Sequence, residues 1–189
     1  LIKGGVYLEE GRKLAWIALD KTGTITHGKP VQTDFEVLSN VSAGDIRVLA
    51  ASLAGRSDHP VSRAVTDAAK RDGIVLTSVD DFEALAGRGT KGVIDGKLYH
   101  LGNHRLVHEL GRCSDELDAR LTALEQQGKT VMLLAVEQKL SGVIAVADTV
   151  KENSAQAIAE LQNLGLEVWM ITGDTELAEK RGVMELVSF

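Results

Sequence analysis

The sequence predicts a parallel α/β unit built from both ends of the chain, with an antiparallel α+β unit inserted from about residue 31 to about residue 140. Two apolar runs predict the first unit. Residues 14–19 and 167–171 each have the pattern of a strand buried on both faces, as in a parallel sheet, and each leads into a polar turn. Between the two runs, two segments that look like paired strands and a hairpin signal predict the inserted unit.

Periodicity and turn residues place the elements of the chain in order. Within the insert we expect helices over 45–54, 60–71 and 115–127, a hairpin over 93–99, and paired strands over 130–136 and 140–147. Pro60 suits a first helical turn and Ser114 suits an N-cap. Asn153 is expected to cap a last helix over 154–164, which Gly165 ends.

Composition is that of an ordinary globular chain. The chain is 44% apolar and 25% charged, as is usual for globular proteins. Its 189 residues are enough to bury a sizeable core. The net charge of −6 argues against general binding to nucleic acid or anionic membranes. Cys113 is the single cysteine, which fits a reducing compartment. No apolar run approaches the roughly 20 residues that span a bilayer. Because the chain begins at Leu1, without Met, we expect a segment of a longer protein.

The sharpest chemical signal directly follows the first apolar run, in the segment Asp20-Lys21-Thr22-Gly23-Thr24-Ile25-Thr26. A carboxylate at the carboxyl end of a parallel strand lies where open α/β sheets bind ligands. Gly23 permits a tight turn, and the loop amides and Lys21 can meet phosphate oxygens. The pattern indicates attack by Asp20 on a γ-phosphate to give an aspartyl-phosphate. A helix cap or polar turn is the ordinary alternative for a lone Asp.

These seven residues resemble the phosphorylation motif of P-type ATPases, which belong to the haloacid-dehalogenase-like phosphotransferases. The resemblance implies a partial haloacid-dehalogenase-like Rossmannoid phosphorylation domain over 1–30 and 141–189. It implies an inserted antiparallel α+β nucleotide-binding domain over 31–140. Related phosphatases often carry a general acid/base Asp two residues after the nucleophile. Thr22 cannot readily deprotonate water, so the resemblance implies a longer-lived phosphoenzyme, as a pump requires.

Two later segments are similar to further family motifs. Thr172-Gly173-Asp174 resembles the motif whose Thr hydroxyl and backbone amides hold the phosphoryl group, with a strand-to-helix turn as the alternative. The segment 148–152 resembles the return to the phosphorylation domain and is expected to have little part in the site. By the same resemblance Mg²⁺ would bind the Asp20 carboxylate and the Thr22 backbone. We expect that site to be incomplete, because the family's later Asp-bearing segment is not in the sequence.

The segment Ser57-Asp58-His59-Pro60 resembles the Ser-Glu-His-Pro motif of heavy-metal P-type ATPases, in which the His lies beside adenine. An imidazole at a helix start can stack on a purine or hydrogen-bond to it. A plain surface helix start is the alternative.

Gly87-Arg88-Gly89 and Gly102-Asn103 resemble the family's Gly-x-Gly and Gly-Asn nucleotide motifs. Glycines let the backbone approach a ligand closely, although Gly-x-Gly alone also fits a turn. Asn103 equally fits the N-cap of the next helix. Ala54 stands where the family usually has a Glu that accepts from the adenine amino group. We therefore expect weak selectivity for adenine.

Together, the resemblance implies the ATP-binding and phosphorylation portion of a heavy-metal pump, in which ATP with Mg²⁺ phosphorylates Asp20 to drive metal efflux. Its implied partners are the actuator and transmembrane domains, with this portion a cytoplasmic part of a membrane protein. The segment alone is expected to be monomeric and poorly active. The segment 2–9, with Asp58 and Val61, is most similar to the zinc/cadmium/cobalt branch.

Two alternatives stay open. His100, His104 and His108 recur every four residues, so His104 and His108 could share a helix face and bind Zn²⁺ or Cu²⁺, although a solvated face is the ordinary explanation. A free-standing aspartate-nucleophile phosphatase is the second alternative, and Thr22 argues against it.

Overall fold

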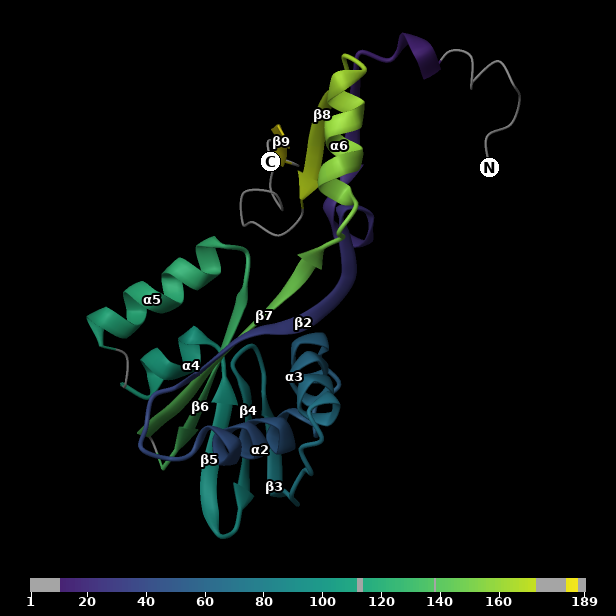
Figure 1. The fold of residues 1–189 in the computed structure, drawn as a ribbon. Coiled ribbons are helices and arrows are strands. Elements are labelled where there is room, and N and C mark those ends of the chain that lie inside the picture. Colours follow the sequence, from purple (N-terminus) through teal and green to yellow (C-terminus); the bar gives the residue numbers. More distant parts are fainter. Residues whose placement is uncertain (1–10, 112–113, 138, 173–182, 187–189) are drawn as a thin grey trace. The chain divides into compact units, whose positions relative to one another are not determined.

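The computed structural model describes residues 11–111, 114–137, 139–172 and 183–186, which form two compact units (Figure 1). Residues 1–29 together with 148–189 make the terminal unit, and Pro30–Ala147 make the inserted unit. The predicted fold class, an α/β unit from both chain ends with an antiparallel α+β insert, is confirmed. The second boundary lies at Asp148, inside a continuous strand, whereas the sequence places it at residue 141.

The terminal unit is a three-stranded sheet in the order β1-β8-β9. Strand β1 (Trp16–Asp20) pairs in parallel with β8 (Glu167–Thr172), as the two apolar runs predict, and β9 (Val183–Leu186) pairs antiparallel with β8. Helix α6 (Ser154–Asn163) packs on one face, where Ile158 and Val168 are buried with Ile25 from the turn after β1. This small core holds the end of β1 in place.

The prediction that β1 and β8 are buried on both faces is wrong for the described residues. Ile17 and Leu19 face the core under α6, and their neighbours in β1 alternate to the opposite face. On that face Trp16 is 57% exposed and Ile171 is 42% exposed. The apolar run reflects two apolar faces, but within the described residues only α6 supplies a covering layer.

The inserted unit is a six-stranded sheet in the order β2-β7-β6-β5-β4-β3, with helices on both faces (Figure 1). The pairs from β3 to β7 are antiparallel. The strands are β2 (Thr26–Val37), β3 (Asp80–Leu85), β4 (Gly89–Ile94), β5 (Lys97–Gly102), β6 (Thr130–Val136) and β7 (Lys139–Val150). The helices are α2 (Ala43–Ala54), α3 (Pro60–Arg71), α4 (His104–Glu109) and α5 (Asp115–Gln126).

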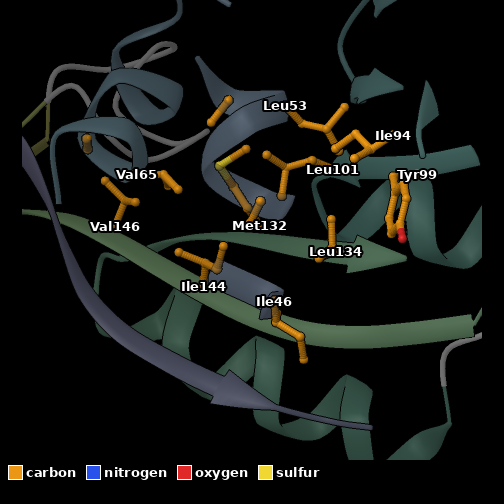
Figure 2. Packing of buried hydrophobic residues seen from close by; sticks show 13 residues of the cluster. Ile46, Leu53, Val65, Ile94, Tyr99, Leu101, Met132, Leu134, Ile144 and Val146 are labelled. Carbon is orange, nitrogen blue, oxygen red and sulfur yellow. The ribbon is translucent and has the colours of Figure 1, made fainter. Parts of the chain in front are cut away.

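Strand alternation divides the core of the inserted unit into two clusters. Met132 and Leu134 of β6 point toward α2 and α3, in the cluster that Figure 2 shows. Val131 and Leu133 point to the other face, toward α4 and α5. A period of two in one strand thus supplies both layers of helices with apolar contacts. The sheet between them is the support on which the loops of this unit are built.

Local signals were mostly correct. The hairpin turns at Asp95-Gly96 with both residues at positive φ, +49° and +74°, as a two-residue Asp-Gly turn requires. The Ser114 hydroxyl accepts from the Leu117 amide at 3.2 Å and caps α5. The predicted Asn153 cap is wrong in its chemistry. Asn153 precedes α6, but its backbone is already helical and its side chain makes no capping hydrogen bond.

Candidate functional site

One pocket in the inserted unit gathers most of the residues that the sequence predicts for nucleotide binding. It has a volume of about 350 Å³ and lies where the start of α3 meets the ends of β4, β5 and β6. Among its lining residues are Ser57, His59, Gly87, Gly89, Gly102 and Asn103. Val61, Leu85 and Met132 supply apolar surface. The pocket thus combines apolar side chains with backbone from two glycine turns.

The other two residues of the Ser-Asp-His-Pro motif do not line this pocket. Asp58 is fully exposed and forms a 3.0 Å ion pair with Arg63. Pro60 occupies the first position of α3, where a proline's missing amide hydrogen costs nothing. Their part is to start the helix rather than to contact a ligand in the pocket.

His59 is the N-cap of α3. Its Nδ1 accepts from the Val61 amide at 3.3 Å, and its own amide donates to the Ser57 hydroxyl at 3.3 Å. An accepting Nδ1 places the proton of the neutral ring on Nε2. The ring is exposed at the pocket and keeps a donor and a flat face for a ligand. The cap therefore orients the imidazole that the sequence singled out.

The glycines of the pocket have different physical roles. Gly89 has φ of +144°, and a Cβ there would overlap the carbonyl oxygen of Leu101 in β5. A Cβ on Gly102 would overlap the side chain of Leu106 in α4. At Gly87, with φ of +67°, a Cβ would meet no atom within 4 Å. Close packing of β4, β5 and α4 therefore requires Gly89 and Gly102, while Gly87 supplies open backbone.

Asn103 joins the two glycine turns. Its side-chain oxygen accepts from the Leu106 amide at 3.2 Å, so it caps α4. Its side-chain amide donates to the Gly87 carbonyl at 3.0 Å. The N-cap alternative raised by the sequence is thus present, and the same side chain also fixes the Gly87 turn at the pocket wall.

Arg88 is a pocket residue for which no role was predicted. Among the described residues that line the pocket, it is the only Lys, Arg, Asp or Glu. Its Nε donates to Oε2 of Glu109 at 2.6 Å, and this hydrogen bond is the main cause that lowers the pKa of Glu109. The signal was present as the central residue of Gly87-Arg88-Gly89. Arg88 therefore lines the pocket as a residue that is ion-paired with Glu109.

Ala54 does not face this pocket. It is 0% exposed and packs in the core cluster of α2 and α3. Its Cβ points into the core, so Ala54 offers no contact to a ligand in this pocket.

A second pocket, of about 480 Å³, lies beside α2 and the β4–β5 hairpin. Its lining includes Lys97 and Tyr99 but none of the predicted site residues.

In the terminal unit Asp20 is the exposed last residue of β1. It pairs with Ile171, so the next residue of β8, Thr172, ends at the same edge of the parallel sheet. Gly173 and Asp174 lie outside the described residues. The register thus brings the predicted nucleophile and the start of the Thr172 motif to one edge of the sheet. This is expected, because the carboxyl ends of parallel strands lie at the same edge.

The loop after Asp20 is held by side chains from the returning chain. Gly23, at φ of +78°, makes the turn. The Lys151 amine donates to the carbonyls of Gly23 at 2.7 Å and Thr24 at 3.0 Å, and the Ser154 hydroxyl donates to the Ile25 carbonyl at 2.7 Å. From the sequence, segment 148–152 is expected to have little part in the site, so this role was not predicted. The signal available was the family resemblance of that segment.

Comparisons with known proteins identify the family of this chain. A family model of the haloacid dehalogenase-like hydrolases matches residues 14–188. The chain belongs to this hydrolase family. Among curated relatives of this hydrolase, a probable cadmium-transporting ATPase of Staphylococcus aureus is 44% identical over 183 residues, covering 93% of this chain and 25% of that protein. A copper-exporting P-type ATPase of Staphylococcus saprophyticus is 41% identical, covering 93% of this chain and 22% of that protein.

A solved zinc-transporting PIB-type ATPase in the E2·Pi state is 30% identical to this hydrolase with a TM-score of 0.81, over 95% of this chain and 30% of that one. The predicted resemblance to heavy-metal P-type ATPases is therefore confirmed. The chain spans about a quarter of the length of the curated relatives it matches. In the described part of the hydrolase, no helix has both the length and the apolar character needed to cross a membrane.

Proposed function

We propose that this chain is the ATP-binding and phosphorylation portion of a heavy-metal cation-translocating P-type ATPase. The observation that carries the proposal is that residues of three separate motifs line one pocket. These residues are Ser57, His59, Gly87, Gly89, Gly102 and Asn103. Relatives named as cadmium-transporting and copper-exporting ATPases support the pump class.

The inserted unit is proposed to bind the nucleotide. A purine would lie against the His59 ring and the apolar side chains of the pocket, which include Val61 and Leu85. The backbone at Gly87 would approach the ligand, and Arg88 would attract its phosphates. A volume of about 350 Å³ is within the usual range for a small-molecule site.

The terminal unit is proposed to carry the chemical step. A carboxylate oxygen of Asp20 attacks the γ-phosphorus, an O–P bond forms, and the bond from that phosphorus to the β–γ bridging oxygen breaks, so that ADP leaves with the electron pair. Lys21, the loop amides and Thr172 with Gly173 and Asp174 would hold the transferred group. Thr22 offers no strong base, so the aspartyl-phosphate should persist.

The proposed cofactor Mg²⁺ fits the donors present at Asp20. A carboxylate and the Thr22 backbone carbonyl are the hard oxygen ligands that Mg²⁺ prefers. When bound, the ion would neutralise phosphate charge.

In the full protein, the actuator and transmembrane domains are the proposed partners, and this portion would face the cytoplasm while the pump expels metal. We favour the zinc/cadmium/cobalt branch because of the residues of segment 2–9. The cadmium-transporting and copper-exporting relatives have similar sequence identity to this chain, 44% and 41%. The portion alone is expected to act as a monomer.

Calorimetric titration with ATP tests the nucleotide site with a matched pair of variants. Arg88→Gln and Lys97→Gln each remove one cation from a pocket wall, but only Arg88 lines the predicted nucleotide pocket. We expect ATP binding that Arg88→Gln weakens and Lys97→Gln leaves unchanged. Equal weakening by both variants, or no ATP binding by the wild type, would contradict the proposal.

A phosphate-release assay separates the pump portion from the free-standing phosphatase. We expect little or no turnover of ATP by this chain. Robust release of phosphate without added divalent metal, lost in Asp20→Asn, would favour the phosphatase instead.

A further inference from the structure

Helices α4 and α5 bring two histidines and a carboxylate to one point on the inserted unit. Nε2 of His104 lies 2.9 Å from Oδ1 of Asp118, and Nε2 of His108 lies 2.8 Å from the same oxygen. One potential ligand atom from each of the three residues lies within 4.8 Å of the other two. The two imidazole rings are 4.8 Å apart between centroids. The i, i+4 spacing in α4 places both rings on the face that meets α5.

We propose that His104, His108 and Asp118 form a binding site for a divalent transition-metal cation of the zinc type. Two imidazole nitrogens and one carboxylate oxygen are a recurring ligand set for Zn²⁺, with a fourth position left for water. Imidazole donors disfavour Mg²⁺ and Ca²⁺, which prefer oxygen ligands. The site is separate from the pocket proposed for nucleotide and does not depend on that proposal.

A fourth residue supports this arrangement by contacting the other side of one ring. Nδ1 of His104 lies 3.4 Å from Oε2 of Glu125 in α5. A histidine that binds metal through Nε2 almost always donates its Nδ1 hydrogen to a carboxylate, a backbone carbonyl or water. Glu125 can therefore fix the tautomer and orientation of His104. This carboxylate–histidine arrangement goes beyond three polar side chains that happen to meet on a surface.

Accessibility favours entry of an ion without rebuilding the helices. The His104 side chain is only 17% exposed, whereas His108 and Asp118 are 56% and 43% exposed. Ligands of a tetrahedral zinc ion are about 3.3 Å apart, given bonds of about 2.0–2.1 Å. The carboxylate oxygen must therefore move back slightly from both nitrogens, and the exposed Asp118 and His108 side chains have room to do so. His104 would stay in place as the fixed ligand.

Titration of this chain with Zn²⁺ by calorimetry, in the absence of nucleotide, tests the site. We expect one ion per chain, with affinity reduced on the order of 100-fold in His108→Ala and in Asp118→Asn, because each removes a direct ligand. Glu125→Gln should give a smaller loss, about tenfold, as an outer partner. His27→Ala is the matched control, because His27 is an exposed histidine beside Glu152 in the terminal unit. It should bind Zn²⁺ like the wild type.

The absorption spectrum of the Co²⁺-loaded wild-type chain gives a readout that does not depend on any variant folding correctly. We expect the visible bands of a four-coordinate Co²⁺ bound by nitrogen and oxygen. A thiolate charge-transfer band would show that the ion is bound by Cys113, the single cysteine, and would overturn the proposal. So would Zn²⁺ affinity that is unchanged in both His108→Ala and Asp118→Asn, or the absence of any binding to the wild type.

Discussion

Oγ1 of Thr26 lies 2.5 Å from Oδ2 of Asp148, which joins two segments that are 122 residues apart in the sequence. Thr26 ends the loop after Asp20 and is 1% exposed, and its oxygen also accepts from the Gly23 amide at 3.2 Å. The other oxygen of the Asp148 carboxylate accepts from the Lys29 amide at 3.2 Å. One carboxylate of the returning strand therefore holds the far end of the nucleophile loop.

Replacing Asp148 should destabilise the terminal unit. Asp148→Ala leaves the buried Thr26 hydroxyl without its charged acceptor, so we expect a loss of about 1.5–3 kcal/mol in the free energy of unfolding. Urea unfolding measures it, and a double-mutant cycle with Thr26→Val should show coupling between the two residues. Asp58→Ala removes a carboxylate whose only described partner is exposed, and it should leave stability unchanged. Additive effects of Thr26→Val and Asp148→Ala would contradict the prediction.

Two substitutions at His59 separate its two roles. His59→Ala removes both the ring and the cap of α3, so we expect a loss of about 1 kcal/mol in stability and about 1–2 kcal/mol in ATP binding. His59→Asn keeps a good N-cap without the ring, and it should lose only the ATP binding. Thermal unfolding and calorimetry measure the two quantities. If His59→Asn binds ATP like the wild type, the ring does not contact the nucleotide.

Local patterns in the sequence were sufficient to predict elements whose own residues restrict the backbone conformation. They were insufficient for elements whose conformation depends on pairing with a distant segment. The helix beginning at Pro60 and the hairpin at Asp95-Gly96 follow from fixed or positive φ values. Strand β2 was not predicted because Gly28 and Pro30 interrupt its pattern. Its extended form comes from pairing with β7, more than a hundred residues later in the chain.

The pocket shows the same limit. Its motif residues could be named from the sequence, but their division into ligand-facing and packing roles could not. Gly89 and Gly102 are required by neighbouring backbone and side-chain atoms that only the folded sheet brings near. The Lys151 contacts to Gly23 and Thr24 also depend on which distant segment meets the loop.

Stability should depend on pH through His100. Burial, with a smaller contribution from Lys91, lowers the pKa of His100 below its ordinary value of 6.5, and its Nδ1 is buried without a hydrogen-bond partner among the described residues. Below pH 6.5 the unfolded chain binds a proton that the folded chain resists. The stability that His100 contributes is therefore present above pH 6.5 and is lost as pH falls through the folded pKa.

His100→Gln cannot titrate and is the comparison for this effect. Urea unfolding at a series of pH values should show the wild type losing stability relative to His100→Gln as the pH falls below 6.5. Other titrating groups are shared by the two proteins and cancel in the difference. Parallel curves for the two proteins would show that His100 is protonated equally in the folded and unfolded chain.

Ala54 offers the sharpest disagreement between the family pattern and the structure. The usual Glu at this position would contact adenine, so the pattern alone predicts that Ala54→Glu restores a preference for ATP over GTP. In the structure Ala54 lies on the same face of α2 as Ile46 and Ala50, and all three are fully buried. A carboxylate there must be buried in an apolar core or must force the end of α2 to move.

We therefore expect Ala54→Glu to lose on the order of 3 kcal/mol or more in the free energy of unfolding at neutral pH. Ala54→Gln, of the same shape without the charge, should lose less. Burial raises the pKa of a Glu, so part of the difference between the two variants should disappear as the pH falls toward the ordinary pKa of Glu. ATP and GTP titrations should give the same affinity ratio in wild type and Ala54→Glu. A stable Ala54→Glu whose ratio favours ATP by about tenfold more, worth about 1.4 kcal/mol, would place this side chain at the nucleotide and out of the core.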